Sequence, residues 1–327
     1  MKPCSYTRAE DTDAAIAIRS AHPQAAYIAG GTTLLDLMKD QVLVPDLLVD
    51  ITRLPLRGIE VTESLVRIGA LTTMSEIAGE PTIRDRYPMI AEALLLSASP
   101  QLRNMATIGG NLLQRTRCGY FRDPAFACNK RVPGSGCPAI AGANRMHAIL
   151  GTSPHCIATH GSDVAVALVA LDAVVQVRGP QGERRIPLHD FYVLPGTTPE
   201  RENVLAQGEL IVAVEIPPTF DATRSHYLKV RDRASYEFAL TSAAVALEMD
   251  GATIRAARIA LGGVGTVPWR VRAAEVLLQG ASLDKKVFDE ASEAALVGAI
   301  PQHDNAFKVG LAKRTLVRAL MTVGGLA

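Results

Sequence analysis

The chain has 327 residues, a length that predicts two or three domains at about 100–200 residues per domain. Its composition, 48% apolar and 20% charged, is typical of a folded protein and excludes a disordered chain. A formal net charge of +1 gives no indication of a nucleic-acid or anionic-lipid partner, and no apolar run approaches the roughly 20 residues of a transmembrane helix. The opening Met1-Lys2-Pro3-Cys4 lacks the apolar stretch of a signal peptide, so we expect this chain to stay where it is made unless a partner carries it.

The first fifty residues alternate helix and strand signals. A helix, a strand ending on Gly30-Gly31, a second helix and a second strand are predicted in turn at residues 13–19, 25–29, 34–39 and 47–51. Strand, glycine turn, helix and strand together form an α/β unit. A strand at residues 65–71, a helix capping box at Thr73 with Glu76, and a helix at residues 88–97 with proline in its first turn follow.

A long irregular stretch interrupts the middle of the chain. Residues 114–162 have neither the period of a strand nor that of a helix, and so long an irregular stretch needs something else to organise it. A helix at residues 163–171 and strands at residues 173–178 and 209–217 are predicted after it.

From about residue 220 the pattern changes. Strands are predicted at residues 226–230, 241–249 and 254–261, and the Asp250-Gly251 turn between the last two is a hairpin signal. Amphipathic helices are predicted at residues 270–278, 283–296 and 306–320. A small sheet covered by helices is α+β, so we predict a domain boundary near residue 220.

The cysteines are concentrated in the irregular stretch. Cys4 stands alone, whereas the other four lie close together in sequence, at Cys118, Cys128, Cys137 and Cys156. A disulfide framework usually extends through a small secreted domain, so four ligands of one metal centre are the favoured interpretation. Four thiolates suit a [4Fe–4S] cluster or a zinc ion. The absence of a C-x2–4-C pair favours the cluster, with zinc, disulfides and free thiols as alternatives, and we do not expect the three histidines of the stretch to be ligands.

Two glycine pairs are candidate anion-binding loops. They are Gly30-Gly31 in residues 28–33 and Gly109-Gly110 in residues 106–111. Glycine permits close backbone approach and positive φ, so successive N–H groups can line a concavity for phosphate. Two such loops could hold the two phosphates of a dinucleotide, although two ordinary turns are the simpler alternative. Neither loop matches G-x-G-x-x-G or a P-loop, which disfavours a Rossmann nicotinamide site and a nucleoside triphosphate site.

The other polar motifs give no sign of substrate chemistry. Ser162 and Asp163 stand directly before a predicted helix, where a hydroxyl and a carboxylate are natural caps, and capping is the favoured local role. Nothing in the sequence has the pattern of a nucleophile with its base, which argues against a hydrolase or a transferase. From the residues alone, a zinc-stapled binding module without flavin is an alternative of another class.

Taken together, these residues resemble the FAD-binding medium subunit of the molybdenum hydroxylases, the family of xanthine dehydrogenase, carbon monoxide dehydrogenase and aldehyde oxidoreductase. The resemblance runs over nearly the whole chain and is carried by Ala29-Gly30-Gly31-Thr32, Ile68-Gly69-Ala70-Leu71-Thr72, Thr107-Ile108-Gly109-Gly110-Asn111, Gly208-Glu209-Leu210-Ile211 and Gly262-Gly263-Val264. The cysteine stretch is similar to that of the [4Fe–4S]-containing flavin subunit of periplasmic aromatic-aldehyde oxidoreductases. The medium subunit of 4-hydroxybenzoyl-CoA reductase, which also has a cysteine insertion, is the nearest rival.

The resemblance implies an α+β architecture in three parts. The two-subdomain FAD-binding fold of the vanillyl-alcohol oxidase type would have its first subdomain at residues 1–55. The second would occupy residues 56–220, with the iron–sulfur insertion at residues 114–161. A small C-terminal α+β domain, an antiparallel sheet plus helices, would occupy residues 221–327.

The resemblance also implies a set of cofactor contacts. Residues 29–34 and 106–111 would hold the FAD pyrophosphate, Ala98 and Leu113 would be apolar walls, and Ser162 and Asp163 would bond the ribityl or adenosine region. Leu210, Ile211 and Lys229 would lie at the isoalloxazine end. The implied set for FAD is Ile28, Ala29, Gly30, Gly31, Thr32, Thr33, Leu34, Ala98, Ala106, Thr107, Gly109, Gly110, Asn111, Leu113, Ser162, Asp163, Leu210, Ile211 and Lys229. Cys118, Cys128, Cys137 and Cys156 would ligate the cluster, and no catalytic residue is expected.

The function implied by the resemblance is electron transfer in a heterotrimeric aldehyde oxidoreductase. A large molybdopterin subunit would oxidise the aldehyde, and electrons would pass through two [2Fe–2S] clusters on a small subunit to FAD on this chain and then to an external acceptor. The expected location is the periplasm, by co-export with a signal-bearing partner, or the cytoplasm. Neither nucleic-acid binding nor membrane insertion is expected.

Overall fold

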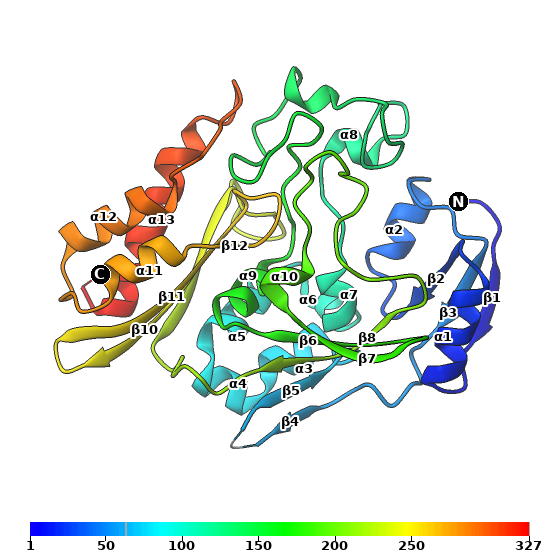
Figure 1. The fold of residues 1–327 in the computed structure, drawn as a ribbon, viewed down its shortest axis with the longest axis horizontal. Helices are drawn as coiled ribbons and strands as arrows, with labels where there is room; N and C mark the ends of the chain where they lie inside the picture. The colour runs from blue at the N-terminus through cyan, green and yellow to red at the C-terminus, as the bar shows by residue number, and fades with distance from the viewer. Residues whose placement is uncertain (63, 327) are drawn as a thin grey trace.

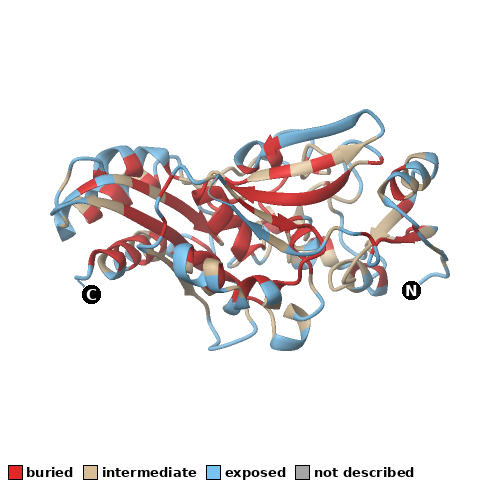
Figure 2. Ribbon diagram, turned by 90° about the horizontal axis from the view of Figure 1, so that it is seen from below, coloured by how far each residue is buried: buried red, intermediate tan, exposed pale blue. Residues whose placement is uncertain are grey.

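Three β-sheets follow one another along the chain in the computed structural model, which describes residues 1–62 and 64–326. Figure 1 shows them side by side, with the N-terminal sheet at one end of the molecule, the C-terminal sheet at the other, and residues 114–161 along one edge. Figure 2 shows that burial is greatest through the central part of the molecule, where helices and sheets pack against one another.

The N-terminal sheet is parallel, and it confirms the predicted α/β unit. Its strand order is β1-β3-β2, with both outer strands parallel to β3. The strands and their helices are β1 (Ser5–Arg8), α1 (Thr12–Ala21), β2 (Ala25–Ile28), α2 (Leu34–Lys39) and β3 (Leu47–Asp50). Strand β1 is not predicted from the sequence, because it is a short edge strand whose residues are mostly exposed and lack an apolar alternation.

The central sheet has five antiparallel strands in the order β4-β5-β8-β6-β7. These strands are β4 (Ile59–Val61), β5 (Val66–Gly69), β6 (Val174–Gly179), β7 (Gly182–Pro187) and β8 (Leu210–Ile216). Its helices are α3 (Met74–Gly79), α4 (Pro81–Arg86), α5 (Pro88–Leu95), α6 (Pro100–Arg103), α7 (Ile108–Leu112), α9 (Asp163–Ala170) and α10 (Leu188–Phe191). The predicted capping box of Thr73 and Glu76 is present at the start of α3. Every residue of α9 is buried, as expected of a helix that is apolar on all faces.

The C-terminal sheet confirms the α+β prediction. Its antiparallel strands are β9 (Ser225–Val230), β10 (Thr241–Asp250), β11 (Thr253–Gly262) and β12 (Trp269–Arg270), and its helices are α11 (Arg272–Leu278), α12 (Lys285–Ala295) and α13 (Phe307–Gly324). Along β10, Ala243 and Val245 pack into the C-terminal core, whereas Ala244 and Ala246 pack into the central core. Successive side chains point to opposite faces of a strand, so this sheet is covered on both sides and β10 is apolar along most of its length. The helix predicted from residue 270 begins at Arg272 instead, because Trp269 and Arg270 pair with β11.

Residues 114–161, called the cysteine segment below, are largely irregular, as expected. Two short elements interrupt the segment, α8 (Gly119–Arg122) and a 3-10 turn at Pro138–Ile140. The backbone N–H groups of Ile149 and Leu150 both donate to the carbonyl of Val264, at 2.8 and 3.0 Å, which attaches the segment to the end of β11. Within the described part of the chain, no helix has the length and apolar character needed to cross a membrane.

Candidate functional site

A cleft of about 720 Å³ lies between the N-terminal unit and the central unit. Its volume is within the range of about 300–1,000 Å³ that is usual for ligand and cofactor sites. All of the predicted FAD contacts except Ile28 and Ser162 line it: Ala29, Gly30, Gly31, Thr32, Thr33, Leu34, Ala98, Ala106, Thr107, Gly109, Gly110, Asn111, Leu113, Asp163, Leu210, Ile211 and Lys229. The structure therefore brings together residues that are far apart in the sequence.

The two glycine loops meet backbone to backbone in this cleft. A Cβ atom at Gly30 would lie 1.8 Å from the carbonyl oxygen of Met105, so only glycine fits there. A Cβ atom at Gly109 would lie 3.1 Å from Cβ of Ala70, and the Gly109 N–H donates to the Ala70 carbonyl at 3.0 Å. This close approach is the observation that fits two backbone cradles for a pyrophosphate, as the glycine pairs predict.

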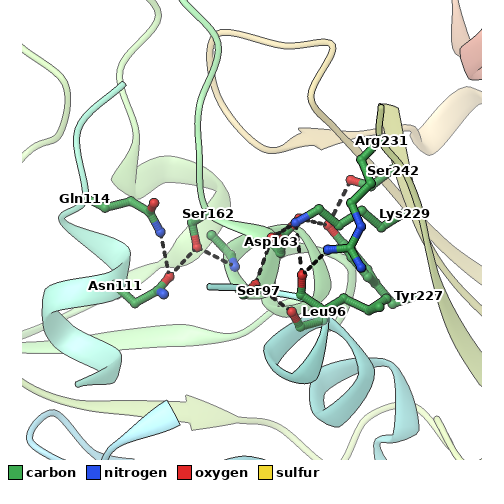
Figure 3. Close-up of polar contacts among 12 residues, drawn as sticks. Leu96, Ser97, Asn111, Gln114, Ser162, Asp163, Tyr227, Lys229, Arg231 and Ser242 are labelled. Atoms are coloured by element: carbon green, nitrogen blue, oxygen red, sulfur yellow. Dashed lines mark hydrogen bonds and ion pairs between the residues drawn. The ribbon is translucent and has the colours of Figure 1, made fainter. Parts of the chain in front are cut away.

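Asn111 and Ser162 are engaged with each other. Ser162 Oγ donates to Asn111 Oδ1 at 2.6 Å, and Gln114 Nε2 donates to the same oxygen at 3.0 Å (Figure 3). Ser162 Oγ also accepts from the N–H of Ala165, so Ser162 is the N-cap of α9. Ser162 thus stands behind Asn111 and supports it, and the local prediction that Ser162 caps a helix is confirmed.

Asp163 is the centre of a buried polar network (Figure 3). Its Oδ2 atom lies 2.8 Å from Ser97 Oγ and accepts from Lys229 Nζ at 2.8 Å. Its Oδ1 atom accepts from the hydroxyl of Tyr227 at 2.7 Å, and that hydroxyl lies 2.8 Å from Ser242 Oγ. Only 8% of the Asp163 side chain and 1% of the Lys229 side chain are exposed, so this is a buried ion pair in the wall of the cleft.

Lys229 and Arg231 share a second acceptor. Lys229 Nζ donates to the carbonyl of Leu96 at 3.2 Å, and Arg231 Nη1 donates to the same oxygen at 2.9 Å. Tyr227 and Lys229 alternate along β9, so their side chains point to one face of the strand, and Arg231 follows directly after the end of β9. Sequence reasoning found Lys229 but missed Ser97 and Tyr227. The alternation on β9 is the one local signal that could have identified Tyr227.

Ala98 has an unusual backbone conformation at the wall of the cleft. Its φ of 51° lies in the left-handed region, which is uncommon for residues other than glycine. Backbone strain of this kind tends to occur at ligand sites, where the surrounding structure enforces it. The conformation of Ala98 thus agrees with its predicted place beside a cofactor.

A second cavity, of about 650 Å³, adjoins the cleft, and Gly161, Asp163 and Phe238 line both. His160 lines this second cavity and is held neutral there. Burial lowers the pKa of His160 to about 4. The Nδ1 atom of His160 accepts a hydrogen bond from the N–H of Ser162 at 3.3 Å, which only an unprotonated ring nitrogen can do.

This neutral histidine predicts a stability change in acid. Between pH 6.5 and pH 4 the unfolded chain binds a proton at His160 that the folded chain excludes, so the free energy of unfolding falls as the pH falls through that window, by up to about 3 kcal/mol. Urea denaturation at pH 7 and pH 5 measures the change. We expect His160→Gln to show a weaker pH dependence than the wild type, whereas His22→Gln, at an exposed position, leaves it unchanged. Equal slopes in the two variants would contradict this origin.

The four cysteines of the cysteine segment line one small cavity. Cys118, Cys128, Cys137 and Cys156 all contribute to its wall, together with two histidines. All are free thiols, so the disulfide alternative is not supported. As the side chains stand, no group of three or more His, Cys, Asp or Glu residues in the described part of the chain is arranged to hold a metal. The four cysteines predicted as ligands therefore line the same cavity, but in the described part of the chain their side chains are not arranged as metal ligands.

Burial keeps three of these cysteines in the neutral thiol form. Burial raises the pKa of the Cys118 thiol to about 11, and burial also raises the pKa values of Cys137 and Cys156. A metal ion favours the thiolate form and reverses this preference. Four soft sulfur donors around one cavity therefore fit an iron–sulfur cluster or zinc in donor type and number.

Arg117 connects the cysteine segment to the cleft. Its Nη1 atom lies 3.0 Å from Asp36 Oδ2 on α2, and its guanidinium lies over the ring of Phe238, 4.8 Å from the ring centroid. Arg122 also pairs with Asp36. Arg117 lines the cleft and the next residue, Cys118, lines the cysteine cavity, so the two sites are neighbours.

Comparisons with known proteins agree with this arrangement. Residues 2–219 match the family described as the FAD binding domain in molybdopterin dehydrogenase, and residues 226–323 match the CO dehydrogenase flavoprotein C-terminal domain. The aldehyde oxidoreductase FAD-binding subunit PaoB of Escherichia coli (strain K12) is 49% identical over 323 residues, covering 98% of each chain. The carbon monoxide dehydrogenase medium chain of Hydrogenophaga pseudoflava is 29% identical over 301 residues, covering 90% of this chain and 88% of that one.

Solved structures show the same fold. A Cu,Mo-containing CO dehydrogenase matches with a TM-score of 0.79 and 27% identity, covering 100% of both chains. Quinoline 2-oxidoreductase from Pseudomonas putida 86 matches with a TM-score of 0.76 and 25% identity, covering 100% of this chain and 99% of that chain. The chain therefore belongs to the molybdenum hydroxylase family as an FAD-binding medium subunit, the flavoprotein subunit of an oxidoreductase.

Proposed function

We propose that this chain is the FAD and [4Fe–4S] electron-transfer subunit of a heterotrimeric, molybdenum-dependent aldehyde oxidoreductase. The observation that carries the proposal is the 49% identity, over 98% of both chains, to the FAD-binding subunit of an aldehyde oxidoreductase. The partners are a large molybdopterin subunit and a small [2Fe–2S] subunit, and this chain delivers the electrons to an external acceptor. The 29% identity to a carbon monoxide dehydrogenase medium chain supports the multi-subunit assembly.

The predicted FAD contacts are proposed to act in three groups. The backbones of residues 29–34 and 106–111 hold the pyrophosphate, which is supported by the close approach of Gly30 to Met105 and of Gly109 to Ala70. Ala98 and Leu113 are apolar walls. Asp163 bonds the ribityl or adenosine region, and Leu210, Ile211 and Lys229 lie at the isoalloxazine end. Ser162 acts by fixing Asn111 and the start of α9, and Ile28 acts as the last residue of β2 before the loop.

A bound flavin supplies the ability to accept electrons one at a time and release them in pairs. The chain's own contribution is to bind, orient and tune it. The Asp163–Lys229 pair places a neutralised charge pair in the wall of the cleft, with Tyr227 and Ser97 fixing the carboxylate. Because these groups are buried and hydrogen-bonded, the polarity they present to the flavin is fixed in direction.

The proposed ligands of the [4Fe–4S] cluster are Cys118, Cys128, Cys137 and Cys156. Zinc found at this site would replace the cluster assignment. Support comes from their convergence on one cavity beside the cleft. We expect Cys137→Ser to lower the iron and acid-labile sulfide content severalfold while FAD remains bound, because the FAD contacts lie on other segments. Metal analysis and flavin release from the same sample measure both. Loss of FAD in step with iron, or an unchanged iron content, would contradict this assignment.

The cluster is further proposed to be an electron reservoir or a structural staple rather than an obligate part of the electron path. Its four proposed ligands lie in an irregular segment between α7 and α9 and line their own cavity, and none of them lines the cleft. Turnover that is fully abolished in Cys137→Ser with FAD still bound would overturn this point.

Two further proposals concern organisation and location. The chain divides at residues 1–55, 56–220 and 221–327, which is supported by the fact that each of the three sheets falls within one of these ranges. The proposed location of the complex is the periplasm, by co-export with a signal-bearing partner, or the cytoplasm. Cell fractionation of the producing organism distinguishes the two, and recovery of the complex with the membrane fraction would contradict both.

Anaerobic mixing of the purified complex with an aromatic aldehyde tests the proposed function. Bleaching of the flavin absorption within the turnover time, followed by its return when an acceptor is added, is the expected result. A flavin that the aldehyde never reduces, in a complex with an intact molybdenum centre, would overturn it. Reduction of the flavin by ferredoxin, with electrons flowing toward the molybdenum subunit, would instead indicate the acyl-CoA reductase alternative.

A further inference from the structure

Lys308 is a fully buried lysine whose ammonium group is bound by backbone carbonyls. It lies in the first turn of α13, and its relative exposure is 0%. Its Nζ atom donates to the carbonyls of Met146, His147 and Gly263, at 3.1, 3.0 and 2.8 Å. Burying a cation is costly unless its hydrogen bonds are satisfied, so this geometry holds all three carbonyls in place.

Asn305, just before α13, also forms hydrogen bonds to the cysteine segment around His147. Its Nδ2 atom donates to the carbonyls of His147 and Ala148, at 3.2 and 3.4 Å, and Asn305 is itself fully buried. The start of α13 thus fixes the backbone on both sides of His147. These contacts cross more than 150 residues of sequence, so a C-terminal helix sets the position of His147.

The ring of His147 points toward one of the proposed cluster ligands. His147 Nε2 lies 3.1 Å from Cys118 Sγ, and the side chain is buried with 6% relative exposure. A thiolate sulfur bound to a metal has no hydrogen to donate, so in that state the hydrogen of this contact would have to be on Nε2. Hydrogen bonds to cluster sulfurs raise the reduction potential of the cluster.

We propose that His147 is a positioning residue that donates a hydrogen bond to the sulfur of Cys118, and that Lys308 holds it there from the C-terminal helix. The proposal rests on the proposed cluster. Through His147, helix α13 of the C-terminal unit would influence the electronic properties of the cysteine site without contacting a cysteine itself. His147 is neither a predicted ligand nor part of the flavin cleft.

The first test compares three variants in the purified complex. His147→Ala is expected to keep its iron but to have a more negative cluster potential, and His147→Gln, whose amide retains an N–H donor, is expected to return part of the way to the wild-type potential. The matched control is His155→Ala, an exposed histidine that lines the same cavity. Potentials come from spectroelectrochemical titration followed by absorption and EPR, with iron and FAD measured in each sample.

A potential of His147→Ala equal to that of His155→Ala would overturn the hydrogen-bond role. Loss of iron from both His147→Ala and His147→Gln would make His147 a ligand and would also overturn it. A wild-type complex without iron would overturn the proposed cluster itself, and this inference with it. If the wild-type complex contains iron and the His147 variants keep the wild-type potential, only this inference is overturned and the proposed cluster stands.

The second test concerns Lys308. Lys308→Met removes the charge and keeps the length of the side chain, and we expect its iron content per FAD to fall below half that of the wild type. Lys313→Met is the control, because Lys313 is on the same helix and pairs with Glu293 at the surface. If Lys308→Met keeps both its iron and the wild-type potential, the anchoring role is wrong. If the variant does not fold, Asn305→Ala is measured in its place by the same criteria.

Discussion

Replacing Gly30 with alanine is expected to weaken FAD binding severely. The added Cβ would lie 1.8 Å from the carbonyl oxygen of Met105 and 2.6 Å from its carbonyl carbon, and backbone atoms cannot move aside as a side chain can. The two glycine loops would have to separate, and with them the two cradles for the pyrophosphate. A loss of about 3 kcal/mol or more, roughly 100-fold or more in affinity, is the expected magnitude. The FAD-to-protein ratio after purification and FAD titration of the apoprotein measure it.

Gly79→Ala is the matched control for this prediction. Gly79 ends α3, and a Cβ atom there would meet nothing within 4 Å. Alanine is the better helix former, so Gly79→Ala should bind FAD normally and be as stable as the wild type or slightly more stable. If Gly30→Ala also retained stoichiometric FAD, the two loops could not be the paired cradle described above.

The second large effect is expected at Lys229. Lys229→Met leaves the buried carboxylate of Asp163 without its cation, and removing one partner of a buried pair typically destabilises a protein by about 3–5 kcal/mol. Tyr227 and Ser97 still stabilise the carboxylate, so the lower end of that range is expected. Urea denaturation of the apoprotein measures the free energy of unfolding without a contribution from flavin binding.

A double-mutant cycle identifies the origin of the effect. Combining Lys229→Met with Asp163→Asn removes the uncompensated charge, so the double variant should be less destabilised than the sum of the two single variants. Lys285→Met is the surface control: Lys285 pairs with Asp289 four residues later on α12, and its loss should cost about 0.5 kcal/mol or less. Additive effects of Lys229→Met and Asp163→Asn would show that the pair is not coupled.

Features built from neighbouring residues could be predicted from the sequence. The Thr73 capping box, the β10–β11 hairpin at Asp250-Gly251 and the glycine loops all depend on residues within a few positions of each other, and all are present. The fully buried α9 also follows from its continuous apolar run. Periodicity was therefore enough for most element positions and for the α+β character of the C-terminal part, whereas the α+β architecture of the whole chain was implied by the resemblance.

Features built from distant residues could not be predicted in this way. The contact of Tyr227 with Asp163 joins residues 64 positions apart, and the contact of Lys308 with Met146 joins residues 162 positions apart. No spacing rule connects such pairs, because only the packing of the C-terminal sheet against α9 and the cysteine segment brings them together. Resemblance supplied Asp163 and Lys229 as single residues, but their mutual neutralisation is visible only in three dimensions.

The most direct test of the account is cofactor analysis of the purified complex. Acid denaturation should release one FAD per copy of this chain, and the chain itself, isolated without oxygen, should carry about four iron and four sulfide per copy, as expected for one [4Fe–4S] cluster. A protein that releases no FAD would contradict the assignment of the cleft. A protein that releases FAD but holds zinc, or no metal, in the cysteine site would contradict the assignment of the [4Fe–4S] cluster.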